Sequence, residues 1–289
     1  MTGTPVPATT RDVEVNGITL RVATWGALVQ AKRAVLLVHG ITANSQYWSN
    51  LGPALAARGW FSIAVDLRGR GRSSRPPHGY GLPFHAADLL SLCDSLGLER
   101  MHFVGHSLGA LIGLYLAAVH PARVGKLVLV DAGGTLPADT IAAIAPALAR
   151  LGTPYSSLDA YLETMLSAPH LAGSNQAFWY RYYRYDAEVR DDGTVTSNVP
   201  KAAIAEEQAA LFLTRTDVLP EYVKAPTLIV RATEGLLGGT RGQLLPAAEA
   251  ERLRGLIPGS QIVEIPGTNH YTIVLNQRFS EAVLTFLED

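Results

Sequence analysis

Short apolar runs alternate with longer helical patterns along most of the chain, and this alternation is the feature that most limits its possible folds. The runs at residues 34–38 and 61–65 are almost continuously apolar, which is typical of strands buried on both faces of a sheet. Similar runs occur at residues 101–104, 126–130, 227–230 and 261–265, with helical patterns at 84–96, 107–120, 246–256 and 276–287. Because strand, helix and strand in succession give parallel pairing, the sequence predicts an α/β fold with a mostly parallel sheet and helices on both faces.

The alternation is interrupted between residues 135 and 223. This stretch has helical patterns broken by Pro and Gly, and we expect no strand pair in it. We therefore expect residues 11–134 and 224–289 to form the α/β core. Residues 135–223 are expected to form a helical cap over one edge of the sheet.

An aromatic run at residues 178–185 lies inside the expected cap. Phe178, Tyr182 and Tyr185 fall at helical spacing, which favours a buried core face. A cap over the reactive edge of the sheet also makes partial lining of a substrate pocket reasonable, so both interpretations stay open.

The composition of the 289-residue chain excludes several classes of protein. Apolar residues make up 48% of it and charged residues 17%, which excludes a disordered chain. The 24 basic and 25 acidic residues form no long run of one sign, so the sequence carries no electrostatic signature of a nucleic-acid partner. We therefore expect a small, neutral, largely apolar substrate.

The sequence also bears on where the protein works. Cys93 is the only cysteine, and its apolar-periodic surroundings predict a buried structural residue. The first ten residues are polar and lack the apolar core of a signal peptide. No apolar run approaches the roughly 18 residues of a membrane span. We expect a cytoplasmic protein with no membrane span.

The segment Gly105-His106-Ser107-Leu108-Gly109 is the clearest candidate for a reactive site. It matches G-x-S-x-G and lies directly after an apolar strand and directly before a small-residue helix. In that context the glycines permit a tight turn from strand to helix, with a strained serine at its tip. The sequence therefore predicts that Ser107 is a nucleophile at the carboxyl end of the sheet.

Two backbone amides are candidates for stabilising a negative charge near Ser107. One belongs to Leu108, the first residue of the helix, and the other to Ile41, in the His39-Gly40-Ile41 segment after a buried strand. Amides in such positions can donate to the oxygen of a tetrahedral intermediate, with roughly 3 to 4 kcal/mol of stabilisation for each donor. His39 itself is expected only to brace this loop.

His270 is the best candidate for the general base. It lies in Thr268-Asn269-His270, immediately after the last predicted strand. A loop that leaves the carboxyl end of a parallel strand delivers its side chains to the edge where Ser107 is expected. The other histidines have no partner that suggests chemistry.

These motifs together resemble the α/β-hydrolase family, in its serine-nucleophile esterase and lipase branch with a helical cap. The resemblance covers essentially residues 13–287. It is carried by Val38-His39-Gly40, by the loop at residues 66–73, by the Ser107 motif, by the run that ends at Asp131, and by Asn269-His270. It implies a Ser-acid-His triad in that chain order and no cofactor, and the serine argues against branches with an aspartate nucleophile.

The identity of the triad acid is where this chain departs from the family pattern. The resemblance implies an Asp in a G-x-x-D segment after the strand before the last one, where this chain reads Arg231-Ala232-Thr233-Glu234-Gly235. Glu234 is the first choice, because its longer side chain makes up part of the offset. Asp131, at the end of the strand after the Ser107 helix, is the alternative acid.

The glycines and arginines of residues 68–72 do not form a phosphate-binding loop. They open no helix and lack a third glycine. Arg68, Arg70 and Arg72 are instead interpreted as bracing the loop and facing solvent.

The sequence therefore predicts a serine hydrolase that cleaves a carboxylic ester, lactone or thioester through an acyl-enzyme. Ser107, His270 and Glu234, with Asp131 as the alternative acid, are its expected triad. Two other functions stay open. One is hydrolysis of a carbon–carbon bond in a dienoate or β-diketone, and the other is a slow-turnover ligand-binding receptor on the same fold.

Overall fold

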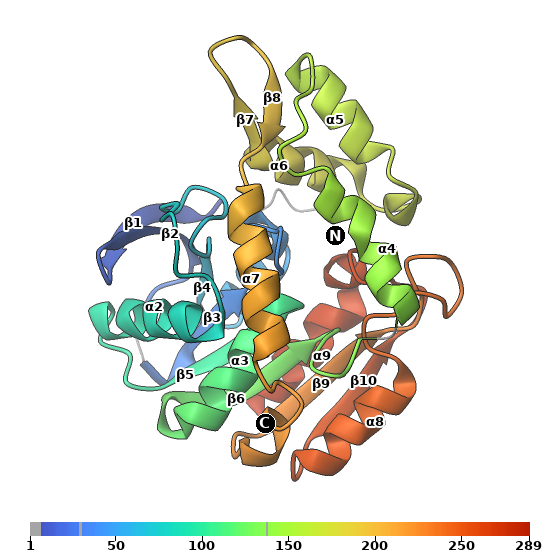
Figure 1. Cartoon of the computed structure of the whole chain (residues 1–289). Coiled ribbons are helices and arrows are strands. Elements are labelled where there is room, and N and C mark those ends of the chain that lie inside the picture. Colours follow the sequence, from blue (N-terminus) through green and yellow to red (C-terminus); the bar gives the residue numbers. More distant parts are fainter. Residues whose placement is uncertain (1–6, 29–30, 137) are drawn as a thin grey trace.

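One twisted sheet lies at the centre of the computed structural model, which describes residues 7–28, 31–136 and 138–289 (Figure 1). Within those residues the sheet has eight strands in the order β1-β2-β4-β3-β5-β6-β9-β10. The strands are β1 Thr9–Val15, β2 Ile18–Trp25, β3 Ala34–Val38, β4 Phe61–Val65, β5 Met101–His106, β6 Val124–Val130, β9 Thr227–Ala232 and β10 Gln261–Ile265. β2 pairs antiparallel with β1 and β4, and the other pairs are parallel, as predicted.

Helices cover both faces of the sheet. They are α1 Leu51–Ala56, α2 Leu82–Ser95, α3 Leu108–Val119, α8 Ala247–Leu256 and α9 Gln277–Glu288. The central strand β3 shows why both faces must be covered, since every one of its side chains is buried. Leu36 packs with the cluster that includes α2 and α3, whereas Leu37 packs with the cluster that includes α1 and α9. This two-sided burial explains the continuous apolar run in the sequence.

The insertion, residues 135–223, separates β6 from β9, and in Figure 1 most of it lies in the upper part of the molecule while its last helix runs down across the middle. Its elements are α4 Ala138–Ala149, α5 Leu158–Leu166, α6 Gln176–Asp186, β7 Ala187–Val189, β8 Val195–Ser197 and α7 Lys201–Leu213. β7 and β8 form an antiparallel hairpin, so the expectation of no strand pair is wrong. Each of these strands has only three residues, which is too short for a periodic pattern to reveal.

The aromatic run forms helix α6 and belongs mainly to the core. Phe178, Trp179, Tyr182 and Tyr183 are buried, in agreement with the predicted core face. Tyr185 is half-buried and donates its hydroxyl to Asp66 Oδ2 at 2.6 Å. The run thus joins the insertion to the loop that follows β4.

The arginines of that loop are placed differently from the expectation that they face solvent. Arg70 is fully buried and pairs with Glu207 of α7 at 2.9 Å, and Arg68 is buried against Asp88 at 2.7 Å. Only Arg72 is exposed. Buried guanidinium groups require such partners because an unpaired buried charge is strongly destabilising.

Two further expectations concern the environment of Cys93 and the presence of membrane-spanning helices. Cys93 is buried, as predicted, and burial raises the pKa of its thiol to about 12. Within residues 7–28, 31–136 and 138–289, the structure has no helix with the length and apolar character needed to cross a membrane.

Candidate active site

Ser107 occupies the strained turn between β5 and α3. Its φ of 56° and ψ of −119° lie in a backbone region that residues other than glycine rarely adopt. A Cβ on Gly105 would lie 2.2 Å from the carbonyl oxygen of Gly109, and a Cβ on Gly109 would lie 2.1 Å from that of Val38. Both positions therefore require glycine, and the turn they permit presents the Ser107 hydroxyl at the carboxyl edge of the sheet.

Asp131 is the acid that the structure brings to His270. The Asp131 Oδ2 atom accepts a hydrogen bond of 2.8 Å from His270 Nδ1, and both side chains are buried. The side chain of Glu234, the first choice in the sequence, is exposed. The backbone amide of Glu234 donates to Thr268, while its carboxylate has no hydrogen bond within the described residues. The geometry thus corrects the expected order of the two candidate acids.

The position of Asp131 explains how it reaches the imidazole. Asp131 follows the last residue of β6 and has a φ of 50°, so like Ser107 it has a positive φ, which residues other than glycine rarely adopt. Its second oxygen, Oδ1, accepts from the amide of Ala232 at 2.9 Å. The carboxylate is therefore fixed by one hydrogen bond on each oxygen.

Ser107 and His270 line the same pocket, so the pair predicted from sequence comes together at one site. No hydrogen bond joins Ser107 Oγ to His270 Nε2 within the described residues. Contacts of this kind are commonly long in a free enzyme and shorten when substrate binds. With Nδ1 engaged by Asp131, Nε2 is the ring nitrogen left to act on the hydroxyl.

A second histidine and a tyrosine fix the His270 loop, and no role for either was predicted from the sequence. His106 Nε2 donates to the carbonyl oxygen of His270 at 2.9 Å, and the Tyr47 hydroxyl donates to the same oxygen at 3.1 Å. Burial and the neighbouring His270 lower the pKa of His106 well below its usual value, so the ring is neutral. His106 occupies the variable position directly before the serine of the G-x-S-x-G motif, and this position beside Ser107 was the one sequence signal that could have indicated its role.

The loop after β3 carries the Ile41 amide beside the pocket. The Gly40 carbonyl accepts hydrogen bonds from His39 Nδ1 at 2.7 Å and from the Ala43 amide at 3.1 Å. His39 Nε2 in turn accepts from the amide of Leu67 at 3.1 Å, and burial lowers the pKa of His39 to about 3. His39 is thus a neutral brace, as expected, and it fixes the peptide unit that holds the Ile41 amide.

Leu108 carries the second candidate amide. It is the first residue of α3, where a backbone N–H has no acceptor within its own helix. The positive end of the helix dipole adds to the attraction for an anion at this point. Both Ile41 and Leu108 line the pocket beside Ser107.

The pocket has a volume of about 630 Å³, within the range of sites that bind small molecules. Helix α4 contributes one face, through Ile141, Ile144 and Leu148, and α7 contributes Leu211 and Phe212. Among the described residues that line it, there is no lysine or arginine. Of the aromatic run on α6, Tyr182 lines the pocket.

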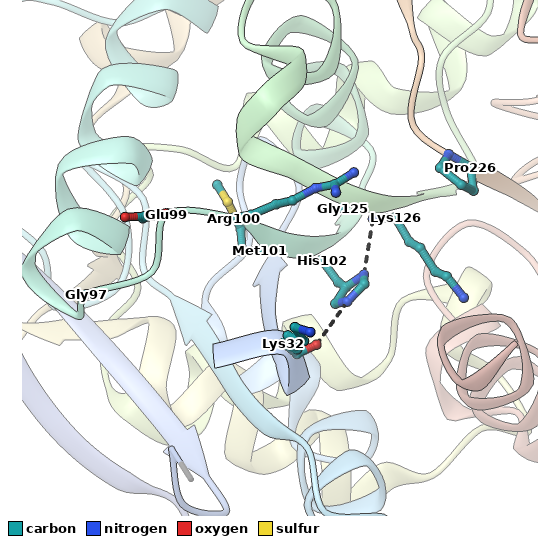
Figure 2. Close-up of a pocket in the computed structure, with 9 residues that line it drawn as sticks. All are labelled: Lys32, Gly97, Glu99, Arg100, Met101, His102, Gly125, Lys126 and Pro226. Carbon is teal, nitrogen blue, oxygen red and sulfur yellow. Dashed lines mark hydrogen bonds between the residues drawn. The ribbon is translucent and has the colours of Figure 1, made fainter. Parts of the chain in front are cut away.

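A second cavity, of about 640 Å³, lies where β5 and β6 begin and is shown in Figure 2. Both ring nitrogens of its His102 are engaged, since Nδ1 accepts from the Lys126 amide at 3.1 Å and Nε2 donates to the Lys32 carbonyl at 3.2 Å (Figure 2). None of its described lining residues is a serine, cysteine or aspartate. The two cavities are similar in size, so chemistry and not volume identifies the Ser107 pocket as the candidate active site.

Comparisons with known proteins identify the family that the chain resembles. Residues 33–277 match the family described as the alpha/beta hydrolase fold. The chain is 30% identical to the 2-(acetamidomethylene)succinate hydrolase of Mesorhizobium japonicum, over 96% of this chain and 95% of that protein. It is 27% identical to a Caulobacter segnis protein named as the carbamate hydrolase RutD, over 95% and 97% of the two chains. A crystal structure of E-2-(acetamidomethylene)succinate hydrolase superimposes with a TM-score of 0.84 at 26% identity, covering 98% of this chain and 100% of the other.

Proposed function

Because the chain belongs to the α/β hydrolase family, we propose that it is a serine hydrolase that cleaves a neutral, largely apolar carboxylic ester through an acyl-enzyme. Ser107 is the nucleophile, His270 the general base and acid, and Asp131 the residue that orients His270. The observation that carries the proposal is the 2.8 Å hydrogen bond between Asp131 and His270 at the pocket that Ser107 lines.

The first half of the reaction forms the acyl-enzyme. His270 Nε2 takes the hydroxyl proton of Ser107 as Oγ attacks the ester carbonyl, and Asp131 stabilises the imidazolium that results. The negative oxygen of the tetrahedral intermediate accepts hydrogen bonds from the amides of Ile41 and Leu108. When the intermediate collapses, His270 returns its proton to the leaving alkoxide, which departs as an alcohol.

The second half repeats these steps with water. His270 Nε2 removes a proton from a water molecule as its oxygen attacks the acyl carbon of the Ser107 ester. Collapse of the second tetrahedral intermediate releases the carboxylic acid, and the proton on His270 restores the Ser107 hydroxyl. The net change is one ester and one water converted to one acid and one alcohol.

The lining of the pocket supports a neutral substrate. An anionic group that enters a buried site needs a cationic or multiply donating partner, and the described lining has no lysine or arginine. Asp217 is the only carboxylate among the described residues that line the pocket, and it would repel a carboxylate substrate. By its name, the Mesorhizobium relative acts on a succinate derivative, so we expect a different substrate class for this chain.

A neutral amide or carbamate is the second candidate substrate. The names of two relatives that cover nearly the whole chain denote hydrolysis of acetamido and carbamate compounds, which favours this chemistry. The acyl-enzyme steps would be the same, except that His270 would protonate a nitrogen leaving group.

The test is a panel of matched neutral substrates for wild type and Ser107→Ala. The panel contains p-nitrophenyl butyrate, the corresponding anilide and carbamate, γ-butyrolactone, and a succinate monoester as the anionic member. We expect turnover of the neutral ester with the highest kcat/KM, poor turnover of the anionic ester, and no turnover by Ser107→Ala. Preference for the anilide or carbamate would favour the second candidate, and preference for the anionic ester would contradict the proposed substrate class.

A further inference from the structure

Large apolar side chains are exposed at the mouth of the Ser107 pocket. Leu136, Ile141 and Phe212 have exposed fractions of 40%, 56% and 90%, and all three also line the pocket. Leu136 precedes α4, Ile141 lies on α4 and Phe212 lies near the end of α7, so the group spans both helices that border the pocket. Single exposed apolar residues are ordinary, whereas a group that continues an apolar pocket indicates a binding surface.

We propose that Leu136, Ile141 and Phe212 form an outer subsite that binds the apolar chain of the substrate, beyond the carbonyl group that reacts at Ser107. This proposal rests on the proposed function. The occupant is a neutral alkyl or aryl chain, because these side chains offer only apolar surface and the pocket behind them has no described lysine or arginine. The subsite therefore predicts that longer acyl chains are better substrates.

The test compares kcat/KM for p-nitrophenyl acetate, butyrate, hexanoate and octanoate, all used below the concentrations at which the esters aggregate. Burial of each added methylene is expected to raise kcat/KM by up to about fourfold. In Phe212→Ser the ratio of octanoate to acetate is expected to fall about fivefold or more. Leu213→Ser is the matched control, since Leu213 is 81% exposed on the same helix and is not part of the pocket lining.

The outcomes separate the subsite from the proposed function. A flat chain-length profile in wild type, or the same ratio in Phe212→Ser and Leu213→Ser, would overturn the subsite while ester hydrolysis stands. Absence of turnover with every ester, acetate included, would overturn the proposed function itself. A ratio that falls in Phe212→Ser and not in Leu213→Ser supports the subsite.

A different set of contacts connects helix α7 to the loop that carries the Ile41 amide. Arg70 Nε donates to the Ile41 carbonyl at 3.0 Å, and Arg70 Nη2 donates to Glu207 Oε2 at 2.9 Å. Both side chains are fully buried. His85 Nε2 donates to the same Glu207 oxygen at 2.6 Å. Glu207 thus faces the core from the same helix that lines the pocket through Leu211 and Phe212.

We infer that Glu207 is a positioning residue for the oxyanion site, acting through Arg70 on the peptide at Ile41. The carboxylate holds the guanidinium in the orientation in which Nε reaches the Ile41 carbonyl. Loss of that orientation would free the loop and misdirect the Ile41 amide, which we expect to donate to the oxyanion in the transition state. The effect should therefore appear in kcat and not in KM.

Glu206 provides a matched control on the same helix. Its Oε1 accepts from the amides of Gly79 and Tyr80, so it also ties α7 to the core, but this tie does not pass through Arg70 or Ile41. We expect Glu207→Gln to lower kcat at least tenfold with KM within about twofold. Glu206→Gln is expected to keep kcat within about twofold of wild type. An equal loss in the two variants, or a change confined to KM in Glu207→Gln, would overturn the inference.

A double variant covers the case in which Glu207→Gln fails to fold. Replacing a buried ion pair by apolar residues of similar size is often neutral or stabilising, so Arg70→Met with Glu207→Leu is expected to fold, with some loss of stability because His85 Nε2 loses its acceptor. The double variant lacks the hydrogen bond to Ile41 and should show the same loss of kcat. Wild-type kcat in a folded double variant would refute the role of this pair.

Discussion

The replacement of Asp131 by asparagine tests how the triad is oriented. The carboxylate makes one hydrogen bond with each oxygen, Oδ1 with the Ala232 amide and Oδ2 with His270 Nδ1. Asparagine has only one oxygen, which the Ala232 amide retains, so its NH₂ group faces Nδ1. That group is a donor, and Nδ1 must then accept. The imidazole proton moves to Nε2, the atom that has to receive the Ser107 proton.

The expected loss follows from this wrong tautomer. We predict that Asp131→Asn lowers kcat by on the order of 10⁴, equivalent to about 5 kcal/mol of transition-state stabilisation. The number of hydrogen bonds is unchanged, so the melting temperature should stay within a few degrees of wild type. The assay is steady-state hydrolysis of p-nitrophenyl butyrate beside a thermal melt.

Glu234→Gln is the matched control for this prediction. The Glu234 side chain is exposed and the His270 Nδ1 atom is already bound to Asp131, so the variant should keep wild-type kcat. A loss of kcat in Glu234→Gln, with wild-type kcat in Asp131→Asn, would refute this account of the triad.

Three further predictions concern the scaffold of the site. Gly109→Ala should lower the free energy of unfolding by about 3 kcal/mol, because its Cβ would meet a backbone oxygen at 2.1 Å. Gly255→Ala, in helix α8 and with open space around the new Cβ, should instead raise the free energy of unfolding by about 0.5 to 1 kcal/mol. Urea unfolding measures both, and equal effects would contradict the steric argument. His39 and His106 stay neutral in the folded protein and gain protons only on unfolding. Below pH 6.5 the free energy of unfolding should therefore fall by up to about 1.4 kcal/mol per pH unit for each of the two histidines. Urea midpoints that do not change between pH 7 and pH 5 would contradict this prediction. Tyr47→Phe removes a donor to the His270 carbonyl and should lower kcat about tenfold, and a wild-type kcat would show that this brace has no effect on the rate.

The main features of the fold could be predicted because they depend on local patterns. The buried strands, the Ser107 turn and the helix after it are each encoded by residues that are neighbours in the chain. The place of His270 follows from one general property of parallel sheets, which bring the carboxyl ends of their strands to one edge.

The choice of acid could not be made from the sequence, for a physical reason. β6 and β9 are adjacent and parallel, with Val130 in register with Val230, so residues that follow either strand emerge close together. Glu234 and Asp131 were therefore both within plausible reach of His270. The choice depends on the positive φ of Asp131 and on the Ala232 amide that binds it, and neither is visible in a residue pattern.

The burial of Arg70 was missed for a related reason. Arginine in a glycine-rich loop usually faces solvent, and the carboxylate that allows Arg70 to be buried lies 137 positions away on α7. No local pattern joins two such residues. The contact becomes visible only once the insertion is folded against the loop after β4.

Covalent labelling of the nucleophile tests the pairing of Ser107 with His270 most directly. A fluorophosphonate probe reacts with a serine hydroxyl only when a neighbouring base activates it, and peptide mass spectrometry then identifies the modified residue. We predict one label per chain, on Ser107, with labelling abolished in Ser107→Ala and greatly slowed in His270→Gln. A label on another residue, or labelling of His270→Gln at the wild-type rate, would contradict the pairing of Ser107 with His270.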